Sequence, residues 1–554
     1  MTSLAPLSWV VPSTTRIGLM DRPGTVLTAD IAAARGESEG FQIGIRSGAS
    51  APLSNVNVEV SDLLGPHSAK ISKADITLYR EQFVRVDNPT KTAADSANPS
   101  LGANWYADGL IPFTHPITKQ PLSGNRLDAA PFSVTLGSNQ VVWVDVYVPR
   151  DTPAGVYKGQ YTVSSDQGNS IGEISLRVWD FEIPLQPSLN SAFTFWQDGS
   201  LAAASELVRH RLMPGNTLQP RQEEALLKLG LNTTRLVFDG GADVNNPMLK
   251  PLPDLADLTA DRDSRSSKAL RYIYLADEVG NYPQLFDELK QWSRLADAAS
   301  LSTLVTMAPT PELFDNGNGK SAVDIWVVTP ELYDQSPANV QAALNNGDRV
   351  WSYNALAPDD YSPKWQIDFD PINFRIQPGF INQSLGLSGL LYWRVDLWTN
   401  DPWNNVQTTL VDNLPFPGEG MLVYPGADVG VRGVVPSMRL KWLRDGVDDY
   451  DYIELLKQAG QPDLALELSR QIGPDWRNWN RDPQELEKVR RRIGEELEKI
   501  TLAEIAGSFN LASLDSELDQ AGAPEEIAAE AIAAEATAPM EVTDPDPDVG
   551  PMVV

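Results

Sequence analysis

Eight short apolar runs follow one another between residues 186 and 436, and this arrangement restricts the possible folds more than any other feature of the chain. Segments with a helical period separate several runs; Leu285, Leu289 and Trp292, for example, recur at helical spacing. Strands that alternate with helices predict a parallel sheet, and eight strands predict a TIM-like (β/α)8 barrel over residues 186–436. The runs are SAFTFW, TTRLVF, RYIYLAD, STLVTM, DIWVV, RVWSYN, GLLYW and GMLVYP.

The first 185 residues carry the two-residue period of β-strands. In VVWVDVYVP, the valines at 142, 144, 146 and 148 alternate with larger or polar side chains. The pattern returns in EISLRV, and turn signals such as TPAGVYKG and SDQGNS separate such runs. We therefore expect residues 1–185 to form a β-sandwich domain.

Two further segments complete the predicted organisation. Residues 437–510 are helical and charged, and DPQELEKVRRRIGEELEKI predicts a surface helix with ion pairs along its own length. Lys and Arg are absent after Lys499, whereas eleven carboxylates follow from Asp515 onward, so residues 511–554 are expected to be a disordered acidic tail. The predicted fold is a multidomain β plus α/β protein: a β-sandwich, a (β/α)8 barrel and C-terminal helices. One stretch of the barrel, residues 239–270, shows no clear helix and is expected to be an irregular loop.

The composition excludes several classes of function. A formal net charge of −30 would repel nucleic acids and anionic membranes, so neither is an expected partner. The chain has no Cys and three scattered histidines, so we expect no disulfide, no metal site built on Cys or His and no cofactor, while calcium bound by carboxylates alone stays open as an alternative. No stretch approaches a membrane span, and the first residues lack a signal-peptide pattern. The chain is expected to be soluble, in an unknown compartment, with any export signal missing from this sequence.

Acidic and aromatic residues stand where the predicted barrel strands end. In a (β/α)8 barrel the reacting groups lie at the carboxyl ends of the strands, because the loops there form one rim. The third run ends on two adjacent carboxylates, Asp277 and Glu278. The other strand ends and their loops add Trp196, Asp239, Tyr353, Asn354, Trp393, Asp396, Trp398, Trp403 and Tyr424.

These side chains suit the cleavage of a glycosidic bond. Sugar rings stack their C–H faces on aromatic side chains, and a carboxylic acid must protonate the leaving oxygen. Trp393, Trp398 and Trp403 are candidate stacking surfaces, and Tyr353, Asn354 and Asp396 are candidate partners of sugar hydroxyls. Simpler explanations exist: the tryptophans could pack in one loop, and an acidic pair is unremarkable in a chain with 74 acidic residues. Position alone leaves the role of the pair open.

Several motifs, in order along the chain, resemble one known family. WSYNALAPDDYSP, GLLYWRVDLWTNDPW, GEGMLVYPG and SMRLKWLRDGVDDYDYIELL follow one another as in the catalytic domain of glycoside hydrolase family 123 and its uncharacterised relatives. RHRLMP, YLADE and VDIWVV fall upstream of them. YADGLIP and VWVDVYVPRDTPAGVYKG resemble the N-terminal β-sandwich of that family, so the resemblance covers about residues 20 to 457.

The resemblance implies a mechanism. In that family the residues matching Asp277 and Glu278 are the catalytic pair, and its known members are retaining β-N-acetylgalactosaminidases that use the substrate's own 2-acetamido group as nucleophile. Glu278 would protonate the glycosidic oxygen and then activate water. Asp277 would accept the acetamide N–H and stabilise an oxazolinium-like intermediate. The family often continues the pair with Pro, whereas here Val279, Gly280 and Asn281 follow, which could reshape the leaving-group side.

Two alternatives stay open from the sequence. A retaining glycosidase of another specificity would pair Glu278 with Asp396 across the barrel mouth. A non-catalytic carbohydrate-binding barrel would keep the tryptophans without turnover. The expected partner in each case is a glycan or glycoconjugate, and the sequence does not indicate the oligomeric state.

Overall fold

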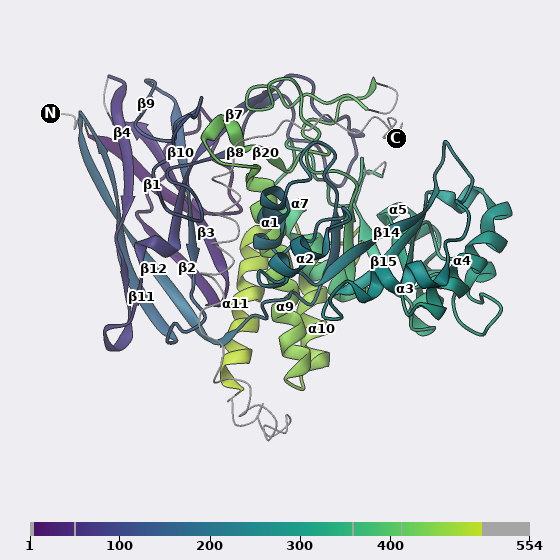
Figure 1. Ribbon diagram of the computed structural model, residues 1–554. Helices are drawn as coiled ribbons and strands as arrows, with labels where there is room; N and C mark the ends of the chain where they lie inside the picture. Colours follow the sequence, from purple (N-terminus) through teal and green to yellow (C-terminus); the bar gives the residue numbers. More distant parts are fainter. Residues whose placement is uncertain (1–4, 49–50, 357–358, 411–412, 501–554) are drawn as a thin grey trace.

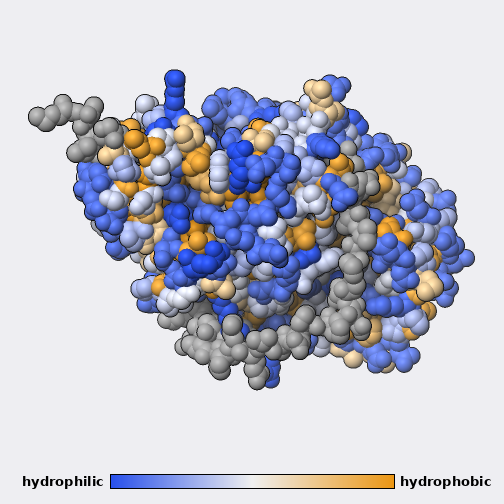
Figure 2. All heavy atoms as spheres, turned by 90° about the horizontal axis from the view of Figure 1, so that it is seen from above, coloured by the Kyte–Doolittle hydropathy of each residue, from blue (hydrophilic) through white to orange (hydrophobic). Residues whose placement is uncertain are grey.

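A computed structural model describes residues 5–48, 51–356, 359–410 and 413–500. Figure 1 shows the strands of the N-terminal part on one side, the C-terminal helices beside them, and the alternating strands and helices beyond. Seen from above, hydrophilic residues dominate the surface and hydrophobic residues form small separate patches (Figure 2). None of the helices in these ranges is long and apolar enough to cross a membrane. The predicted acidic tail, residues 511–554, lies outside the described residues.

Two β-sheets that share one core make up the N-terminal part. The first has the order β1 (Pro6–Pro12), β3 (Ser38–Ser47), β10 (Asn139–Tyr147), β7 (Ile76–Val86) and β8 (Asn104–Pro112). The second has the order β2 (Thr28–Arg35), β12 (Gly168–Glu182), β11 (Gly155–Ser165), β4 (Leu53–Val60) and β9 (Phe132–Val134); β5 (Leu63–Leu64) also pairs with β11, and β6 (Lys70–Ile71) pairs with β5. The alternating valines of β10 are buried with Ile43 of β3 and Leu176 of β12. The sheets therefore pack as a sandwich.

The middle of the chain forms a curled parallel sheet of seven strands. Its order is β13 (Asn190–Phe193), β19 (Gly389–Tyr392), β18 (Arg349–Tyr353), β17 (Ile325–Val328), β16 (Ser302–Thr306), β15 (Leu270–Asp277) and β14 (Thr233–Ala242). Between the two edge strands, Phe193 of β13 bridges to Pro214, and Thr217 bridges to Arg235 of β14. The sheet is therefore barrel-like, but within the described residues its continuous ladder has seven strands in place of the predicted eight.

Two predictions for this region were wrong. The eighth apolar run, GMLVYP, contains β20 (Val423–Pro425), which pairs antiparallel with β21 (Val434–Pro436) outside the parallel sheet. A short apolar run does not reveal which strand it pairs with, so its sequence alone predicts a barrel strand here. Residues 239–270, expected to be an irregular loop, contain the end of β14 and helix α3 (Leu255–Asp263). Only Leu258 of α3 is buried, so the helix has almost no apolar period to recognise.

Helices cover the parallel sheet as the alternating pattern predicts. The predicted helical period around residues 282–299 is confirmed in α4 (Phe286–Ala298), which buries Leu289, Trp292 and Ala296. A π-helical turn at residues 377–381 joins two short helices in the segment between β18 and β19. The other α-helices of the described chain before residue 437 are α1 (Leu201–Arg209), α2 (Pro220–Leu227), α5 (Pro330–Gln335), α6 (Pro337–Asn345), α7 (Ile372–Ile376) and α8 (Asn382–Leu385).

Helix α9 (Met438–Gln458) lies between the sandwich and the parallel sheet (Figure 1) and is buried along most of its length. Three of its basic side chains, Arg439, Lys441 and Arg444, are paired with acids of the sandwich. Arg439 binds Asp108 of β8 through two nitrogens, at 2.8 and 2.9 Å. Arg444 binds both carboxylate oxygens of Asp145 in β10, at 2.9 and 3.0 Å. The charges of α9 therefore tie the sandwich to the rest of the molecule.

Two further helices, α10 (Pro462–Ile472) and α11 (Pro483–Lys499), pack beside α9. The expected ion pairs along α11 are present, for example between Lys499 and Glu496 at 2.9 Å. The helix is not only a surface element, however. Arg490 is buried and binds Asp449 of α9 at 2.9 Å and Glu37 of the sandwich. Such pairing is what a buried guanidinium requires.

Candidate active site

A cavity of about 1660 Å³ lies at the carboxyl ends of the parallel strands. Six of the seven strands contribute to its wall, and the seventh, β17, contributes through Thr329 just after its end, as expected where the loops after parallel strands converge. Among the described residues, no group of three or more His, Asp or Glu side chains could hold a metal ion. The lining includes Thr194 and Trp196 after β13, Arg235 in β14, Asp277 and Glu278 at β15, Thr306 at β16, Thr329 after β17, Tyr353 at β18 and Trp393 after β19.

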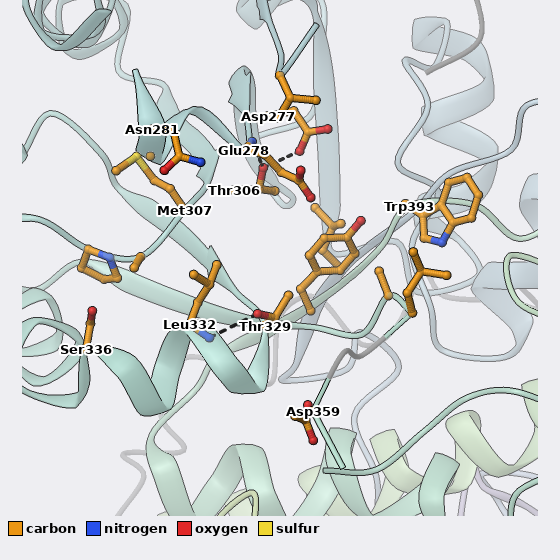
Figure 3. A pocket seen from close by; sticks show the side chains of 18 of the residues that line it. Asp277, Glu278, Asn281, Thr306, Met307, Thr329, Leu332, Ser336, Asp359 and Trp393 are labelled. Carbon is orange, nitrogen blue, oxygen red and sulfur yellow. Dashed lines mark hydrogen bonds between the residues drawn. The ribbon is translucent and has the colours of Figure 1, made fainter. Parts of the chain in front are cut away.

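Asp277 and Glu278 lie where β15 ends at the cavity (Figure 3). Oδ1 of the half-buried Asp277 accepts hydrogen bonds from the hydroxyl groups of Tyr274, at 2.9 Å, and Thr306. Glu278 is more exposed and has a left-handed backbone, with φ of +50° and ψ of +35°, which is uncommon for a residue with a side chain. Its backbone N–H donates to the Thr306 hydroxyl at 2.7 Å. One hydroxyl on β16 therefore contacts both members of the acidic pair.

Both carboxyl groups of the pair have raised pKa values. Burial raises the pKa of Asp277, while the hydrogen bonds from Thr306 and Tyr274 act in the opposite direction. Burial also raises the pKa of Glu278, and the nearby negative charge of Asp277 raises it further. The hydroxyl donors thus favour the ionised form of Asp277. The Glu278 carboxyl group accepts no such bond from the residues that the structure describes, and its raised pKa means that it keeps a proton to higher pH than usual.

Two tryptophans form an aromatic wall of the cavity. The rings of Trp393 and Trp196 meet edge to face, with centroids 5.7 Å apart and an interplanar angle of 87°. The indole N–H of Trp393 donates to the buried Glu419 at 3.0 Å, and the guanidinium of Arg394 lies 4.8 Å from the ring centre of Trp196. Both rings are therefore held in place by charged neighbours and present apolar surface to the cavity.

Tyr353 lines the cavity at the end of β18 and is 9% exposed. Burial, together with the negative charges of Asp277 and Glu278, raises the pKa of Tyr353 well above its ordinary value. Its hydroxyl group stays protonated at any ordinary pH and can act as a hydrogen-bond donor near the acidic pair.

Comparison with known families identifies the chain. The model of the glycoside hydrolase 123 N-terminal domain matches residues 22–165, and the model of the glycoside hydrolase 123 catalytic domain matches residues 272–456. The chain belongs to glycoside hydrolase family 123. This confirms the resemblance seen in the sequence motifs, and membership of family 123 supports glycosidase activity.

One solved structure agrees with this assignment at the level of fold. A family 123 glycoside hydrolase from Clostridium perfringens is similar over 91% of this chain and 100% of that chain, with 14% identity and a TM-score of 0.60. A β-glucuronidase from Parabacteroides merdae matches 75% of this chain and 50% of that chain, with 9% identity and a TM-score of 0.27. No curated protein matched the chain.

Three of the predicted sugar-binding residues in this family 123 chain lie outside the described lining of the cavity. The side chain of Asn354 is buried, and its amide donates to the carbonyl of Pro363 at 3.0 Å and to a neighbouring Gln side chain at 2.8 Å. Trp398 is half-buried, with its N–H on the Val423 carbonyl at 2.9 Å. Trp403 is fully buried, its ring centre 4.6 Å from that of Tyr424. These three side chains therefore contact the protein interior and do not face the cavity.

Asp396, a further candidate sugar-binding residue, is likewise absent from the lining of the cavity. Its side chain is fully buried. Its oxygens accept the backbone N–H groups of Trp196, Gln197 and Asp198 at 2.6–3.1 Å, and the guanidinium of Arg394 approaches at 3.3 Å. A carboxylate so fully engaged holds the loop after β13, and this placement argues against a nucleophile at this position.

Three side chains at the site were not predicted from the sequence. Thr306 is the last residue of an apolar strand and carries no signal of its own. Tyr274 and Asp277 would lie on opposite faces of a regular strand, but the register shifts between Tyr274 and Ala276, and the hydroxyl of Tyr274 reaches the carboxylate. Glu419, in a turn-like GEG sequence, is buried under Trp393.

Proposed function

We propose that this family 123 protein hydrolyses the β-glycosidic bond of a 2-acetamido sugar, of the N-acetyl-β-galactosaminide type, with retention. The observation that carries the proposal is the arrangement of the acidic pair. Both hydroxyl donors found on Asp277 bind Oδ1, while Oδ2 makes no hydrogen bond among the described residues. That oxygen is available for an acetamide N–H, beside an exposed Glu278 whose pKa is raised by burial and by the charge of Asp277.

The reaction has two steps. In the first, Glu278 protonates the glycosidic oxygen while the acetamide carbonyl oxygen of the substrate attacks the anomeric carbon, and the leaving group departs as an alcohol. Asp277 accepts the acetamide N–H and stabilises the positive charge of the resulting oxazolinium ion. In the second, the Glu278 carboxylate takes a proton from water, which attacks the anomeric carbon and reopens the ring. Two inversions give net retention.

The position of the two carboxylates favours this route over direct attack by the enzyme. A conventional retaining pair flanks the scissile bond, with its carboxyl groups about 5–5.5 Å apart on opposite sides of the sugar. Asp277 and Glu278 are neighbours at one strand end and approach the substrate from the same side. Asp396, the alternative partner across the mouth, is buried and bound by three backbone N–H groups.

The aromatic wall supports a sugar ligand. Trp393 and Trp196 offer apolar ring surface for the C–H face of the sugar, and the Tyr353 hydroxyl offers a donor near the acidic pair. The structure of the Clostridium perfringens relative is described in terms of glycolipid glycan hydrolysis. For this chain we propose the wider class, a glycan carried by a glycoconjugate.

Three aryl glycosides test the proposal. The aryl 2-acetamido-2-deoxy-β-galactoside should be cleaved, the corresponding glucoside more slowly, and the unmodified β-galactoside not measurably. A thiazoline mimic of the oxazolinium ion should inhibit, because it resembles the intermediate that the site stabilises. Equal cleavage of the unmodified galactoside, or a trapped glycosyl ester on a carboxylate, contradicts acetamido participation. Binding of sugars without turnover of any substrate would support the non-catalytic alternative.

A further inference from the structure

Part of the cavity wall comes from the β-sandwich. Four residues of the loop between β7 and β8 line the cavity: Thr90, Lys91, Thr92 and Ala93. The acidic pair and the aromatic wall both lie at the ends of strands of the parallel sheet, so the proposed reaction assigns no role to this loop. The loop brings the N-terminal half of the chain to a site that the catalytic half mainly builds.

One carboxylate of the catalytic half holds both ends of this loop. Asp368, which is fully buried between β18 and α7, accepts the Thr90 backbone N–H at 2.6 Å and the Thr90 hydroxyl at 3.0 Å. The Ser100 hydroxyl donates to the same carboxylate at 2.6 Å, and the Leu101 N–H donates to the Asp368 carbonyl at 2.8 Å. Residues 90–101, which we call the sandwich loop, therefore have both ends at one residue, as in an Ω-loop.

The buried carboxylate and the sandwich loop stabilise each other. Burial raises the pKa of the Asp368 carboxyl group, whereas the hydrogen bonds from Ser100 and Thr90 lower it. Because a buried carboxylate needs hydrogen-bond donors, the loop supplies bonds that favour its ionised form. Further along the loop, the Asn98 amide donates to the side chain of Asn373 at 2.7 Å. The loop is therefore anchored on the catalytic half at both ends and near its middle.

A further residue of the sandwich fixes the segment that carries Asp368. The guanidinium of Arg16, between β1 and β2, donates to the backbone carbonyls of Ile367 at 2.7 Å and Phe369 at 2.9 Å. Phe369 itself lines the cavity. The residues on both sides of Asp368 are thus held from the sandwich, so the carboxylate has a fixed place from which to hold the loop.

We propose that Asp368 is a positioning residue: it holds the sandwich loop in place as a wall of the cavity, against which the bound glycan packs. This rests on the proposed function, because the glycan is the ligand that the wall supports. Among the described residues, no member of the loop forms a hydrogen bond with Asp277 or Glu278. The loop therefore supports the ground state and the transition state alike, and its displacement raises KM while kcat stays almost unchanged.

Paired variants of the full chain test the proposal from both sides of the contact. Asp368→Asn keeps the shape of the side chain but replaces one acceptor oxygen by an NH2 group, and Ser100→Ala removes a donor from the loop. The substrate is a disaccharide of 2-acetamido-2-deoxygalactose β-linked to galactose. Each variant should raise KM roughly three- to tenfold, the effect of one hydrogen bond, with kcat within about twofold of the wild type. Together they should raise KM no further than Asp368→Asn alone, because both break the same contact.

Asp428→Asn is the matched control. Asp428 is a carboxylate of the catalytic half that also binds the sandwich, through Arg126 at 2.9 Å, but it is absent from the described lining of the cavity. The same substitution at this position should leave KM at the wild-type value.

Cleavage by trypsin after Lys91 is a second measurement, which does not depend on turnover. Lys91 is exposed and is the only Lys or Arg between Arg85 and Lys119. Cleavage there, identified from the fragment masses, should be faster in Asp368→Asn than in the wild type or Asp428→Asn, because the loop opens more often. Saturating disaccharide should slow this cleavage in Glu278→Gln, because the bound glycan covers the loop.

The outcomes separate this inference from the proposed function. An unchanged KM in Asp368→Asn and Ser100→Ala, with the wild type active, overturns the inference alone. A fall in kcat at unchanged KM, or an equal rise of KM in Asp428→Asn, also overturns it. If Asp368→Asn does not fold, Ser100→Ala decides. No turnover by the wild type overturns the proposed function; protection of Lys91 by the disaccharide then still supports the wall, and no protection overturns the inference as well.

Discussion

Replacing Thr306 by Val removes a hydroxyl group shared by the two acidic residues, while the size and branching of the side chain are kept. Thr306 is 3% exposed; its hydroxyl donates to Asp277 Oδ1 and accepts the Glu278 N–H at 2.7 Å. In the variant, Asp277 keeps one of the two donors found on it, the Tyr274 hydroxyl at 2.9 Å. The Glu278 N–H loses its acceptor in a backbone conformation that is already uncommon.

The expected magnitude follows from these contacts. A hydrogen bond to an ionised group contributes about 1.5–3 kcal/mol. If this energy holds Asp277 in the orientation that meets the acetamide, its loss lowers kcat/KM at neutral pH about 10- to 100-fold, because about 1.4 kcal/mol corresponds to a factor of ten. An unpaired backbone N–H costs about 1–3 kcal/mol, so the free energy of unfolding should fall by a similar amount.

The pH profile separates a positioning role from a merely structural one. Asp277 must be ionised to accept the acetamide N–H, so kcat/KM falls at low pH as its carboxyl group takes up a proton. The Thr306 bond lowers the pKa of Asp277. Without the bond the pKa is higher, and the acidic limb of the kcat/KM profile for the aryl 2-acetamido galactoside should move to higher pH.

Two variants serve as controls for this experiment. Thr306→Ser keeps the hydroxyl and should restore most of the activity and the position of the acidic limb. Thr303→Val removes a buried hydroxyl from the same strand, one that bonds Asp324 at 2.9 Å, and should lower stability without moving the limb. If the profile of Thr306→Val coincides with that of the wild type, or if Thr306→Ser is equally impaired, the hydroxyl does not position the pair.

Other substitutions test the remaining parts of the structure. Glu278→Gln should lower kcat by a factor on the order of 10²–10⁴, and less for aryl groups that leave easily, which a series of substituted aryl glycosides would measure. Asp277→Asn should also lower kcat severely. Because the charge of Asp277 raises the pKa of Glu278, its removal lowers that pKa, and the basic limb of the pH profile of the residual activity should move to lower pH. Trp393→Ala should raise KM and lower kcat; an unfolded variant, seen by circular dichroism, would instead indicate a packing role. Arg439→Met leaves the buried Asp108 without its ionic partner and should lower the free energy of unfolding in urea by about 3–5 kcal/mol; a loss below about 1 kcal/mol contradicts this reading.

The position of the candidate site could be predicted from the sequence because parallel strands end at one edge. Residues at the ends of β13, β15, β18 and β19 were expected to gather there, and Trp196, Asp277, Tyr353 and Trp393 all line the cavity. The seven strands of the parallel sheet were likewise visible as apolar runs. The order of these strands could not be predicted, nor could the bridges that residues 214 and 217 make to the two edge strands, because strand pairing depends on partners far away in the chain.

The failures share a physical cause. A polar residue just after a strand can face the cavity or turn back into the protein, and the sequence does not distinguish the two. The side chain of Asp396 points into the protein, where it accepts three backbone N–H groups from residues 196–198, about 200 positions earlier in the chain. The side chain of Asn354 points into the protein, where its amide donates to the side-chain oxygen of Gln377. The ring of Trp403 also points inward, where it packs against Tyr424 and fills the space left by the missing side chain of Gly109.

The ion pairs of helix α9 also limit which domain exchanges this protein can tolerate in evolution. Its Arg439, Lys441 and Arg444 find their acids, Asp108 and Asp145, on two strands of the β-sandwich. A recombination event that joined this catalytic half to a foreign sandwich would leave buried cations without counter-charges unless the newcomer carried acids on equivalent strands. We therefore expect the sandwich to be inherited with the catalytic half as one unit, and new specificities to arise by substitution in the loops around the cavity, not by exchange of domains.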